Sequence, residues 1–155
     1  MAVGFKVKFY WYQIGDSDFL HSFFSTVAYN LENGNWGSRF PVIMNELYQG
    51  KLECDNTDKA LEELSIIRKE LQKFSPEKVV WDIEDLSKQP PWGNDISEDI
   101  TDLSNYFVTS DGNDFLTVFS HALEKARSQC WNCNKIHVRE CETFSVNDVM
   151  KGLLW

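Results

Sequence analysis

Carboxylates are the most concentrated reactive groups in this sequence. Between residues 82 and 114 the chain has nine acidic residues and one basic residue, Lys88, so this segment carries a net charge of −8 out of −9 for the whole chain. The acidic residues are Asp82, Glu84, Asp85, Asp95, Glu98, Asp99, Asp102, Asp111 and Asp114. Converging carboxylates can hold a divalent cation for hydrolysis, since hard cations require several oxygen ligands. They can also form a solvated surface or a face that binds a cationic protein, and we favour the protein-binding face.

Tryptophan side chains lie among these acids. Interfaces depend on buried aromatic anchors within a charged rim that steers the encounter. Trp92 follows two prolines and precedes Gly93, which predicts a rigidly presented, exposed anchor, whereas core packing is the better interpretation of Trp81. The predicted partner-binding residues are Asp82, Glu84, Asp85, Trp92, Asp95, Glu98, Asp99, Asp102 and Trp36.

A second cluster contains soft metal ligands. Cys130, Cys133, His137 and Cys141 are of the number and type that tetrahedral zinc prefers. Against a zinc site, the second pair is closely spaced, and residues 135–138 have the pattern of a strand, which would point neighbouring side chains apart. In the absence of an export signal we expect these cysteines and Cys54 to be reduced thiols, with no disulfide in the fold. A zinc-stabilised adaptor domain remains an alternative.

Motifs of common enzymes are absent. The sequence has no G-x-S-x-G, H-E-x-x-H, P-loop or G-x-G-x-x-G pattern. None of the three histidines has a neighbouring nucleophile signature, and His21 and His121 are typical of ordinary helix residues. We therefore predict a binding protein without catalytic residues or cofactor. A metal-dependent hydrolase using the carboxylates of residues 82–102 remains an alternative.

The elements that position these groups follow from hydrophobic periodicity. Residues 3–13 alternate as a strand, with Val3, Phe5, Val7, Phe9 and Trp11 on one face. Caps at residues 16–18 begin a helix on which an apolar residue recurs every fourth position until Asn33-Gly34. A short helix over 41–49 starts at Pro41, and a helix over 57–73 places its apolar side chains inside, with Glu62, Glu63, Arg68, Lys69 and Lys73 outside.

The second half of the chain alternates between ordered loops and elements. Residues 78–83 are rich in β-formers and predict a strand, residues 84–101 a long ordered loop, and residues 105–109 a short strand. The turn at 110–114 caps a helix that carries Phe115 and Phe119. Weaker patterns suggest an edge strand over 135–138 and a helix over 145–154. The expected fold is α+β, a small sheet of three to four strands with three to five helices packed on it.

Composition limits the classes of function. The chain has 155 residues, 43% hydrophobic and 14% aromatic, which suits a single packed domain. A net charge of −9 would repel nucleic acid and anionic lipid, so we expect neither as a partner. No stretch approaches the roughly 18–20 apolar residues that span a bilayer, and the N-terminal residues alternate instead of forming a signal peptide. We expect a cytoplasmic protein.

Two segments of the chain have a distinctive sequence, residues 80–93 (VWDIEDLSKQPPWG) and 100–112 (ITDLSNYFVTSDG), and shorter ones are 9–12, 19–24, Trp36-Gly37 and Phe40-Pro41. In these segments the sequence resembles the immunity protein 70 family of bacterial polymorphic toxin systems. The resemblance extends over about residues 1–126. Residues 127–155, which hold the cysteine cluster, depart from it and are expected to be a variable C-terminal extension of the single domain.

The resemblance implies a small α+β protein made beside a secreted or contact-delivered toxin. Such a protein neutralises the cognate toxin inside the producing bacterium by binding it directly, and the family implies no catalytic residues. If the toxin is a nuclease with a basic cleft, an acidic face can imitate the phosphates of its substrate.

Overall fold

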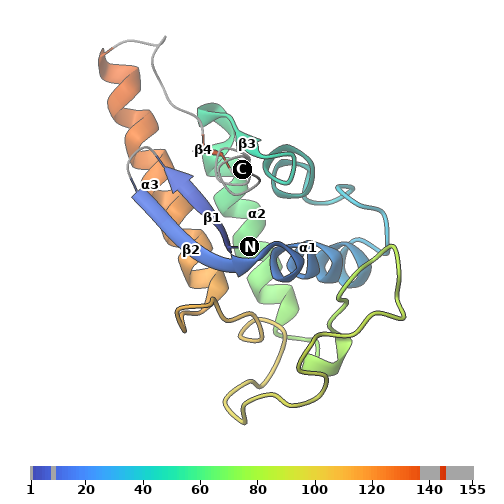
Figure 1. Cartoon of the computed structure of the whole chain (residues 1–155). Coiled ribbons are helices and arrows are strands. Elements are labelled where there is room, and N and C mark those ends of the chain that lie inside the picture. The colour runs from blue at the N-terminus through green and yellow to red at the C-terminus, as the bar shows by residue number, and fades with distance from the viewer. Residues whose placement is uncertain (1, 8–9, 137–143, 146–155) are drawn as a thin grey trace.

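The N-terminal residues form a β-hairpin. The computed structural model describes residues 2–7, 10–136 and 144–145 (Figure 1). Strands β1 (Ala2–Val7) and β2 (Tyr10–Asp16) pair antiparallel, with a register shift between Val3 and Gly4. The expected single strand over 3–13 is therefore wrong, because the chain reverses inside it. The reversal and the shift break the alternation, so Val3, Phe5 and Val7 are buried while Trp11 is 46% exposed.

Two strands of two residues extend this hairpin into the sheet β2-β1-β4-β3. They are β3 (Lys51–Leu52) and β4 (Phe144–Ser145). The α+β class is confirmed. Among the described residues, however, only the two hairpin strands are longer than two residues, so the sheet is less regular than the sequence suggests.

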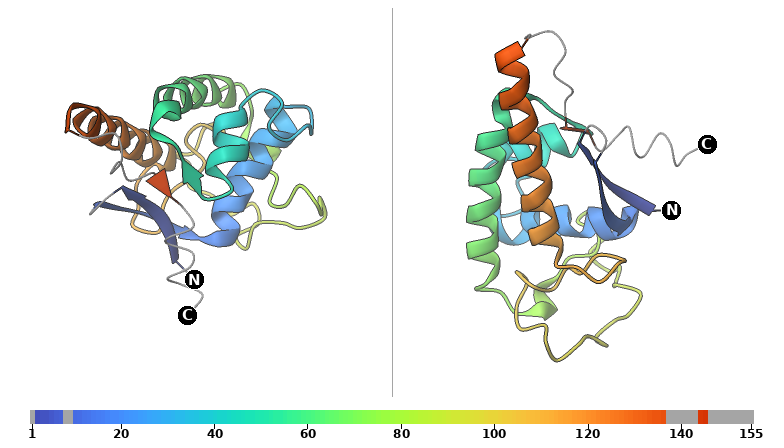
Figure 2. Two further views of the ribbon diagram at one scale, coloured as in Figure 1. Left: turned by 90° about the horizontal axis from the view of Figure 1, so that it is seen from above. Right: turned by 90° about the vertical axis from the view of Figure 1, so that its left-hand side faces the viewer.

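The helices predicted before residue 137 are present. Helix α1 (Ser17–Leu31) is followed by a π-helical segment, η1 (Val42–Leu47), and by a 3₁₀ turn, η2 (Cys54–Asn56). Helix α2 (Thr57–Leu71) precedes the 3₁₀ turn η3 (Pro76–Lys78), and α3 (Phe115–Ile136) closes the series. Figure 2 shows α2 and α3 lying side by side, with the hairpin on one side of α3. Residues 79–114 gather at one end of the molecule.

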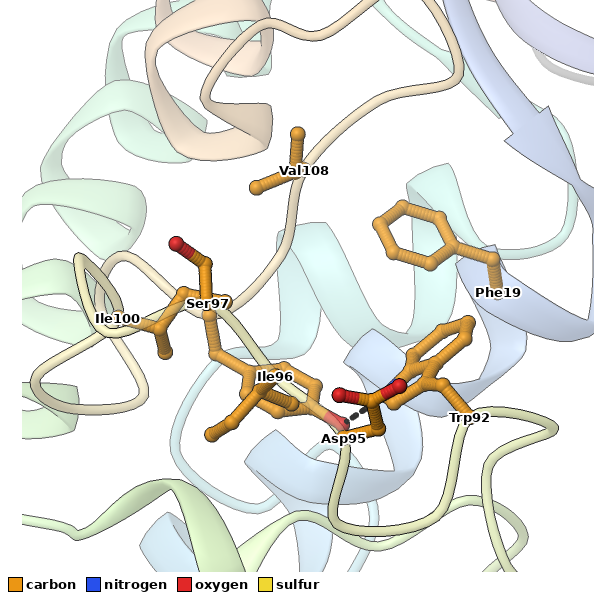
Figure 3. A pocket seen from close by; sticks show the side chains of 8 residues that line it. Phe19, Trp92, Asp95, Ile96, Ser97, Ile100 and Val108 are labelled. Carbon is orange, nitrogen blue, oxygen red and sulfur yellow. Dashed lines mark hydrogen bonds between the residues drawn. The ribbon is translucent and has the colours of Figure 1, made fainter.

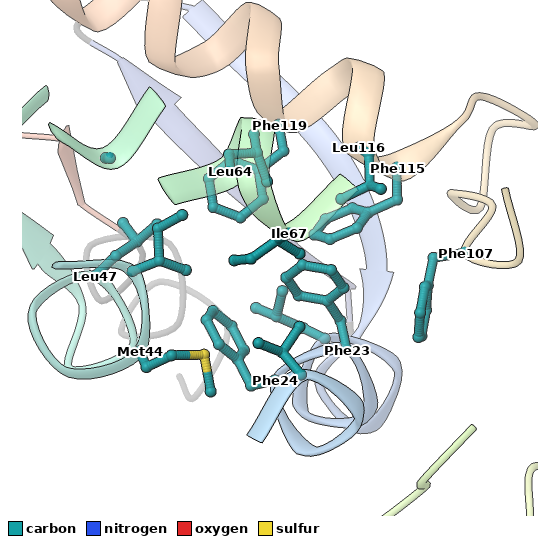
Figure 4. Packing of buried hydrophobic residues seen from close by; sticks show 14 of the residues in the cluster. Phe23, Phe24, Met44, Leu47, Leu64, Ile67, Phe107, Phe115, Leu116 and Phe119 are labelled. Atoms are coloured by element: carbon teal, nitrogen blue, oxygen red, sulfur yellow. The ribbon is translucent and has the colours of Figure 1, made fainter. Parts of the chain in front are cut away.

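Phenylalanine rings fill the space between α1, α3 and the hairpin. The centroid of Phe23 lies 4.8 Å from that of Phe115 and 5.4 Å from that of Phe107, and Phe5 lies 4.7 Å from Phe119. All five rings are fully buried. Figure 4 shows this cluster continuing toward Met44 and Leu47 of η1 and Leu64 and Ile67 of α2. The helix periodicity that predicted the apolar faces is thereby confirmed.

Two predicted strands are not formed. Residues 78–83 run along α1, whose side chains bind their backbone: Thr26 Oγ1 accepts from Val80 N at 3.0 Å and donates to Val80 O at 3.2 Å. Residues 105–109 contribute only an isolated bridge between Val108 and Asp114. The loop predicted over 84–101 is confirmed, and it belongs to a longer irregular segment reaching from 79 to 107.

Three other predictions need correction. Glu63 is 5% exposed, not outside, since its carboxylate accepts hydrogen bonds from the start of η1. Lys135 and Ile136 belong to α3 and not to a strand, because the helix continues through them, and Ser145 lies in β4 and not in a helix. Residues 137, 138 and 146–154 lie outside the described residues.

Cys54 is disulfide-bonded, contrary to the expected reduced thiols. That expectation rests on the redox compartment, which says nothing about which cysteines the fold brings together. In the fold, the η2 turn that carries Cys54 packs against α3. The state of the cysteines therefore cannot be inferred here from the absence of an export signal.

Candidate functional site

Three aspartates in the loop after residue 81 stabilise its turns by hydrogen bonds from their side chains to the backbone. The Oδ1 atom of Asp82 accepts from Glu84 N at 2.9 Å, that of Asp85 from Ser87 N at 3.1 Å, and that of Asp102 from Ser104 N at 2.8 Å. Each is an aspartate turn, in which the side chain binds the backbone two residues on. We name residues 82–102 the acidic loop. Its order comes from these local bonds in place of a strand or helix.

The same bonds keep these carboxyls ionised. Hydrogen bonds from Glu84 N, Lys88 and His21 lower the pKa of Asp82, against a smaller opposing effect of burial. Burial raises the pKa of Asp102, but bonds from Ser104, Thr101 and Asn105 together lower it further, so the net shift is downward. The negative charges of Asp82 and Asp102 are therefore held to more acidic pH than free aspartate would allow.

Helix α1 anchors the beginning of the acidic loop. Ser25 Oγ accepts from Ile83 N at 3.2 Å, and Asn30 Nδ2 donates to Lys78 O at 2.9 Å. His21 Nε2 lies 3.4 Å from Asp82 Oδ1, and His21 Nδ1 lies 3.0 Å from Tyr48 Oη. Side chains on one face of α1 thus form hydrogen bonds with this backbone segment, as a neighbouring β-strand would in a sheet.

Trp92 is fixed at the surface of the acidic loop. Gly93 N donates to Pro90 O at 2.9 Å, and Gly93 has a positive φ of 58°, so the four residues from Pro90 to Gly93 form a turn. The indole Nε1 of Trp92 donates to Tyr106 Oη at 2.8 Å, and its ring meets that of Trp81 edge to face at 5.4 Å. Trp92 remains 38% exposed. Trp81 is half-buried against the core, as the sequence suggested.

A cavity of about 220 Å³ opens beside Trp92. Figure 3 shows the side chains around it, with Phe19 coming from α1 and Val108 from the segment before α3. The acidic loop contributes Trp92, Asp95, Ile96, Ser97 and Ile100, and Tyr106 completes the wall. We name this cavity the Trp92 pocket. The structure brings the predicted residues Trp92 and Asp95 to one opening.

The other predicted residues are distributed differently. Glu84, Asp85, Glu98 and Asp99 are exposed along the acidic loop, and Asp82 and Asp102 are half-buried by the turns they close. None of these lines the Trp92 pocket. These acidic residues lie on the same irregular segment as the Trp92 pocket but outside its lining.

Trp36 lies elsewhere, in the loop between α1 and η1. Its Nε1 donates to Met44 O at 2.7 Å, and its half-buried ring packs against both His21 and Tyr48. The pKa of Tyr48 is raised mainly by burial and further by the negative charges of Glu84 and Asp82. Tyr48 thus connects the aromatic side chains around Trp36 with the beginning of the acidic loop. Trp36 is therefore tied to the site through His21 and Tyr48 and has no place at the Trp92 pocket.

Sequence reasoning missed much of the pocket wall. Phe19 is remote from the acidic loop in sequence and Val108 lies beyond its end, and no local pattern connects either residue with Trp92. Ile96 and Ile100 did carry a signal, since two isoleucines four residues apart in a polar loop need an apolar surface to cover them. That signal points to burial, however, and not to a pocket.

Metal-binding groups are not assembled in the described part of the chain. Among residues 2–7, 10–136 and 144–145, no group of three or more histidine, cysteine, aspartate or glutamate side chains could hold a metal ion. Cys130 and Cys133 belong to α3, but their side chains are not described, and His137 and Cys141 lie outside the described residues. The zinc alternative stays a prediction, whereas the carboxylates of 82–102 give the hydrolase alternative no support.

Comparison with known proteins identifies the family. Of the described helices, none has the length and apolarity needed to cross a membrane. No curated protein and no solved structure matches the chain significantly. The model of the family described as Immunity protein 70 matches residues 5–134, which is most of the sequence and includes α1, α2 and the whole acidic loop. The resemblance seen in the sequence is confirmed, and the chain belongs to the immunity protein 70 family.

Proposed function

We propose that this chain binds a cognate toxin through the acidic loop and neutralises it inside the cell that produces both. The family supports the general role of an immunity protein. The single observation that carries the finer proposal is the ordered loop itself: its aspartates close its turns, and Trp92 is held at its surface by Tyr106 and Trp81. A preorganised loop loses little entropy when a partner binds.

The charge of the acidic loop indicates the chemistry of the toxin surface. Residues 82–114 carry −8, so a cationic surface complements them and anionic partners such as nucleic acid or anionic lipid do not. A nuclease with a basic substrate cleft fits this charge, because carboxylates can occupy the positions of phosphates. Under this proposal the chain covers the toxin and performs no catalysis of its own.

Co-expression tests the proposed neutralisation. The toxin domain encoded beside this chain should arrest growth when expressed alone, and the wild-type chain should restore growth. The two purified proteins should also co-elute as one complex on size exclusion, since the mechanism requires direct binding. Growth that stays arrested, or rescue without a complex, would overturn the proposal.

Charge reversal tests the acidic loop separately. Changing Asp85, Asp95 and Asp99 to lysine should lower the association rate at low salt at least about tenfold, because steering accounts for association well above about 10⁶ M⁻¹s⁻¹. A matched variant changes Asp55, Glu62 and Glu124, which are exposed outside the loop, to lysine. Equal association rates for the two variants would remove the acidic loop from the mechanism.

A further inference from the structure

We propose that the Trp92 pocket receives a single arginine side chain of the toxin, packed against the Trp92 indole and paired with Asp95. This inference rests on the proposed function and specifies what the toxin inserts. The Trp92 pocket measures about 220 Å³, below the range of about 300–1,000 Å³ typical of small-molecule and cofactor sites. Its size therefore suits one inserted side chain better than a separate ligand.

The walls of the Trp92 pocket suit the apolar stem of a long side chain. Phe19 and Tyr106 are the buried part of its wall, 9% and 5% exposed, whereas Trp92 and Val108 are the exposed part, 38% and 43% exposed. Two large apolar side chains at one opening leave surface for a partner to cover. Covering them gains hydrophobic free energy in proportion to the area removed from water.

Asp95 makes the Trp92 pocket selective for a cation. The carboxylates of Asp82, Asp85 and Asp102 are engaged in turns, but within the described residues no hydrogen bond or ion pair engages the carboxylate of Asp95. An inserted side chain without positive charge would remove water from the Asp95 carboxylate without replacing its hydrogen bonds. This desolvation would cost binding free energy. The net charge of −8 on residues 82–114 adds to this preference.

Arginine fits the pair of Trp92 and Asp95 better than lysine. A guanidinium is planar, stacks on an aromatic face and binds a carboxylate through two parallel hydrogen bonds, whereas an ammonium is a strongly hydrated point charge. The Trp92 ring is held by Tyr106 and Trp81, so the stacking surface exists before the toxin arrives. Anchors of this kind dominate the free energy of many interfaces.

A pair of charge-matched variants tests the role of Asp95. Asp95→Asn and Asp99→Asn remove one charge each from the same loop, so they should change steering, and with it the association rate, to a similar degree. Only Asp95→Asn should also raise the dissociation rate from the toxin, by about tenfold or more, because it leaves the inserted guanidinium unpaired. Equal dissociation rates for the two variants would overturn the proposal.

A second pair blocks the opening of the Trp92 pocket. Val108→Arg places a guanidinium of the chain itself there, while Leu86→Arg makes the same change of charge at a residue that is 55% exposed and outside the pocket. Val108→Arg should weaken binding at least about tenfold more than Leu86→Arg. Equal affinities would mean that the pocket stays empty in the complex.

Double-mutant cycles identify the inserted side chain. Each arginine and lysine of the toxin is changed to alanine and combined with Asp95→Asn, and one arginine should show a coupling worth about tenfold or more in affinity. Coupling to a lysine would overturn the assignment of arginine, and coupling to no cation would overturn the insertion. In both cases the wild-type chain would still bind the toxin. Failure of wild-type binding would instead remove the proposed function, and this inference with it.

Discussion

Glu63 shows how one buried carboxylate can organise a neighbouring element. Its oxygens accept from Val42 N at 3.0 and 3.2 Å and from Ile43 N at 3.5 Å, where η1 begins after Pro41. Backbone N–H groups at the start of a helical segment have no partner within it. Glu63 therefore satisfies donors that would otherwise be buried without a partner.

Replacing Glu63 should destabilise the fold. Glu63→Ala leaves the N–H groups of Val42 and Ile43 buried and unsatisfied, which should lower the free energy of unfolding by about 1–3 kcal/mol. Urea unfolding followed by circular dichroism measures this change. The neighbouring Glu62 is exposed, and Glu62→Ala is expected to stay within about 0.5 kcal/mol of wild type. Similar stabilities for the two variants would show that the contact contributes nothing.

The effect of Glu63 should depend on pH. Burial raises its pKa above 4.5, against the lowering effect of hydrogen bonds from Ile43 and Val42. A raised pKa means that the folded state holds the proton more tightly, so the wild type loses this part of its stability as pH rises through the folded pKa. Glu63→Ala lacks the titrating group. Its deficit should therefore be larger at pH 4 than at pH 7, and a deficit that grows with pH would contradict the shift.

Local patterns placed some residues of the fold and of the site correctly and misplaced others. Trp92 could be placed at the surface because the two prolines and Gly93 act on their immediate neighbours. Glu63 could not be placed, since helical spacing put it beside Glu62 on the solvent side and nothing in the spacing reveals that η1 covers this part of α2. The contribution of Phe19 to the Trp92 pocket is of the same kind, because it depends on a contact between remote segments.

At the scale of elements, residues 78–83 show why β-forming residues need not form a strand. A strand requires another strand beside it to bind its backbone, and here Thr26, Ser25 and Asn30 of α1 supply those bonds. Side chains of serine, threonine and asparagine can replace a sheet partner in this way. The helices were predictable because their bonds are internal, whereas pairing between distant segments leaves little trace in local sequence.

The hydroxyl of Thr26 should therefore control the order of this segment. Thr26→Val keeps the shape of the side chain but removes both bonds to Val80, so the unfolding free energy should fall by about 1–3 kcal/mol. Amide hydrogen exchange over residues 79–83 should accelerate at the same time, because Val80 N loses its acceptor. Thr26→Ser retains the hydroxyl and serves as the control. If exchange in Thr26→Val matches that of Thr26→Ser, the segment is held by packing alone.

At the scale of the whole molecule, the regular elements that build the core and the segment that carries the charge lie in different places. The hairpin, α2 and α3 surround a core of phenylalanine and aliphatic side chains, while residues 79–114 at one end of the molecule carry −8 of the net charge of −9 (Figure 1). Self-repulsion among these acids opposes a compact loop, and the turns closed by Asp82, Asp85 and Asp102 offset it. The negative charge at one end therefore creates an electrostatic field that can orient a cationic partner before the two proteins are in contact.

Ionic strength should therefore act on association more than on dissociation. The Debye length falls from about 30 Å at 0.01 M salt to about 8 Å at 0.15 M, so the field of the acidic loop reaches an approaching cationic toxin only at low salt. The association rate of the wild type should fall at least about tenfold over this range, measured by stopped-flow fluorescence. A variant with Asp85, Asp95 and Asp99 changed to asparagine should show a shallower dependence, while asparagine and glutamine at Asp55, Glu62 and Glu124 should leave the slope nearly unchanged. Equal slopes for the two variants, both shallower than that of the wild type, would show that the toxin responds to the total charge of the molecule and not to its concentration on one loop.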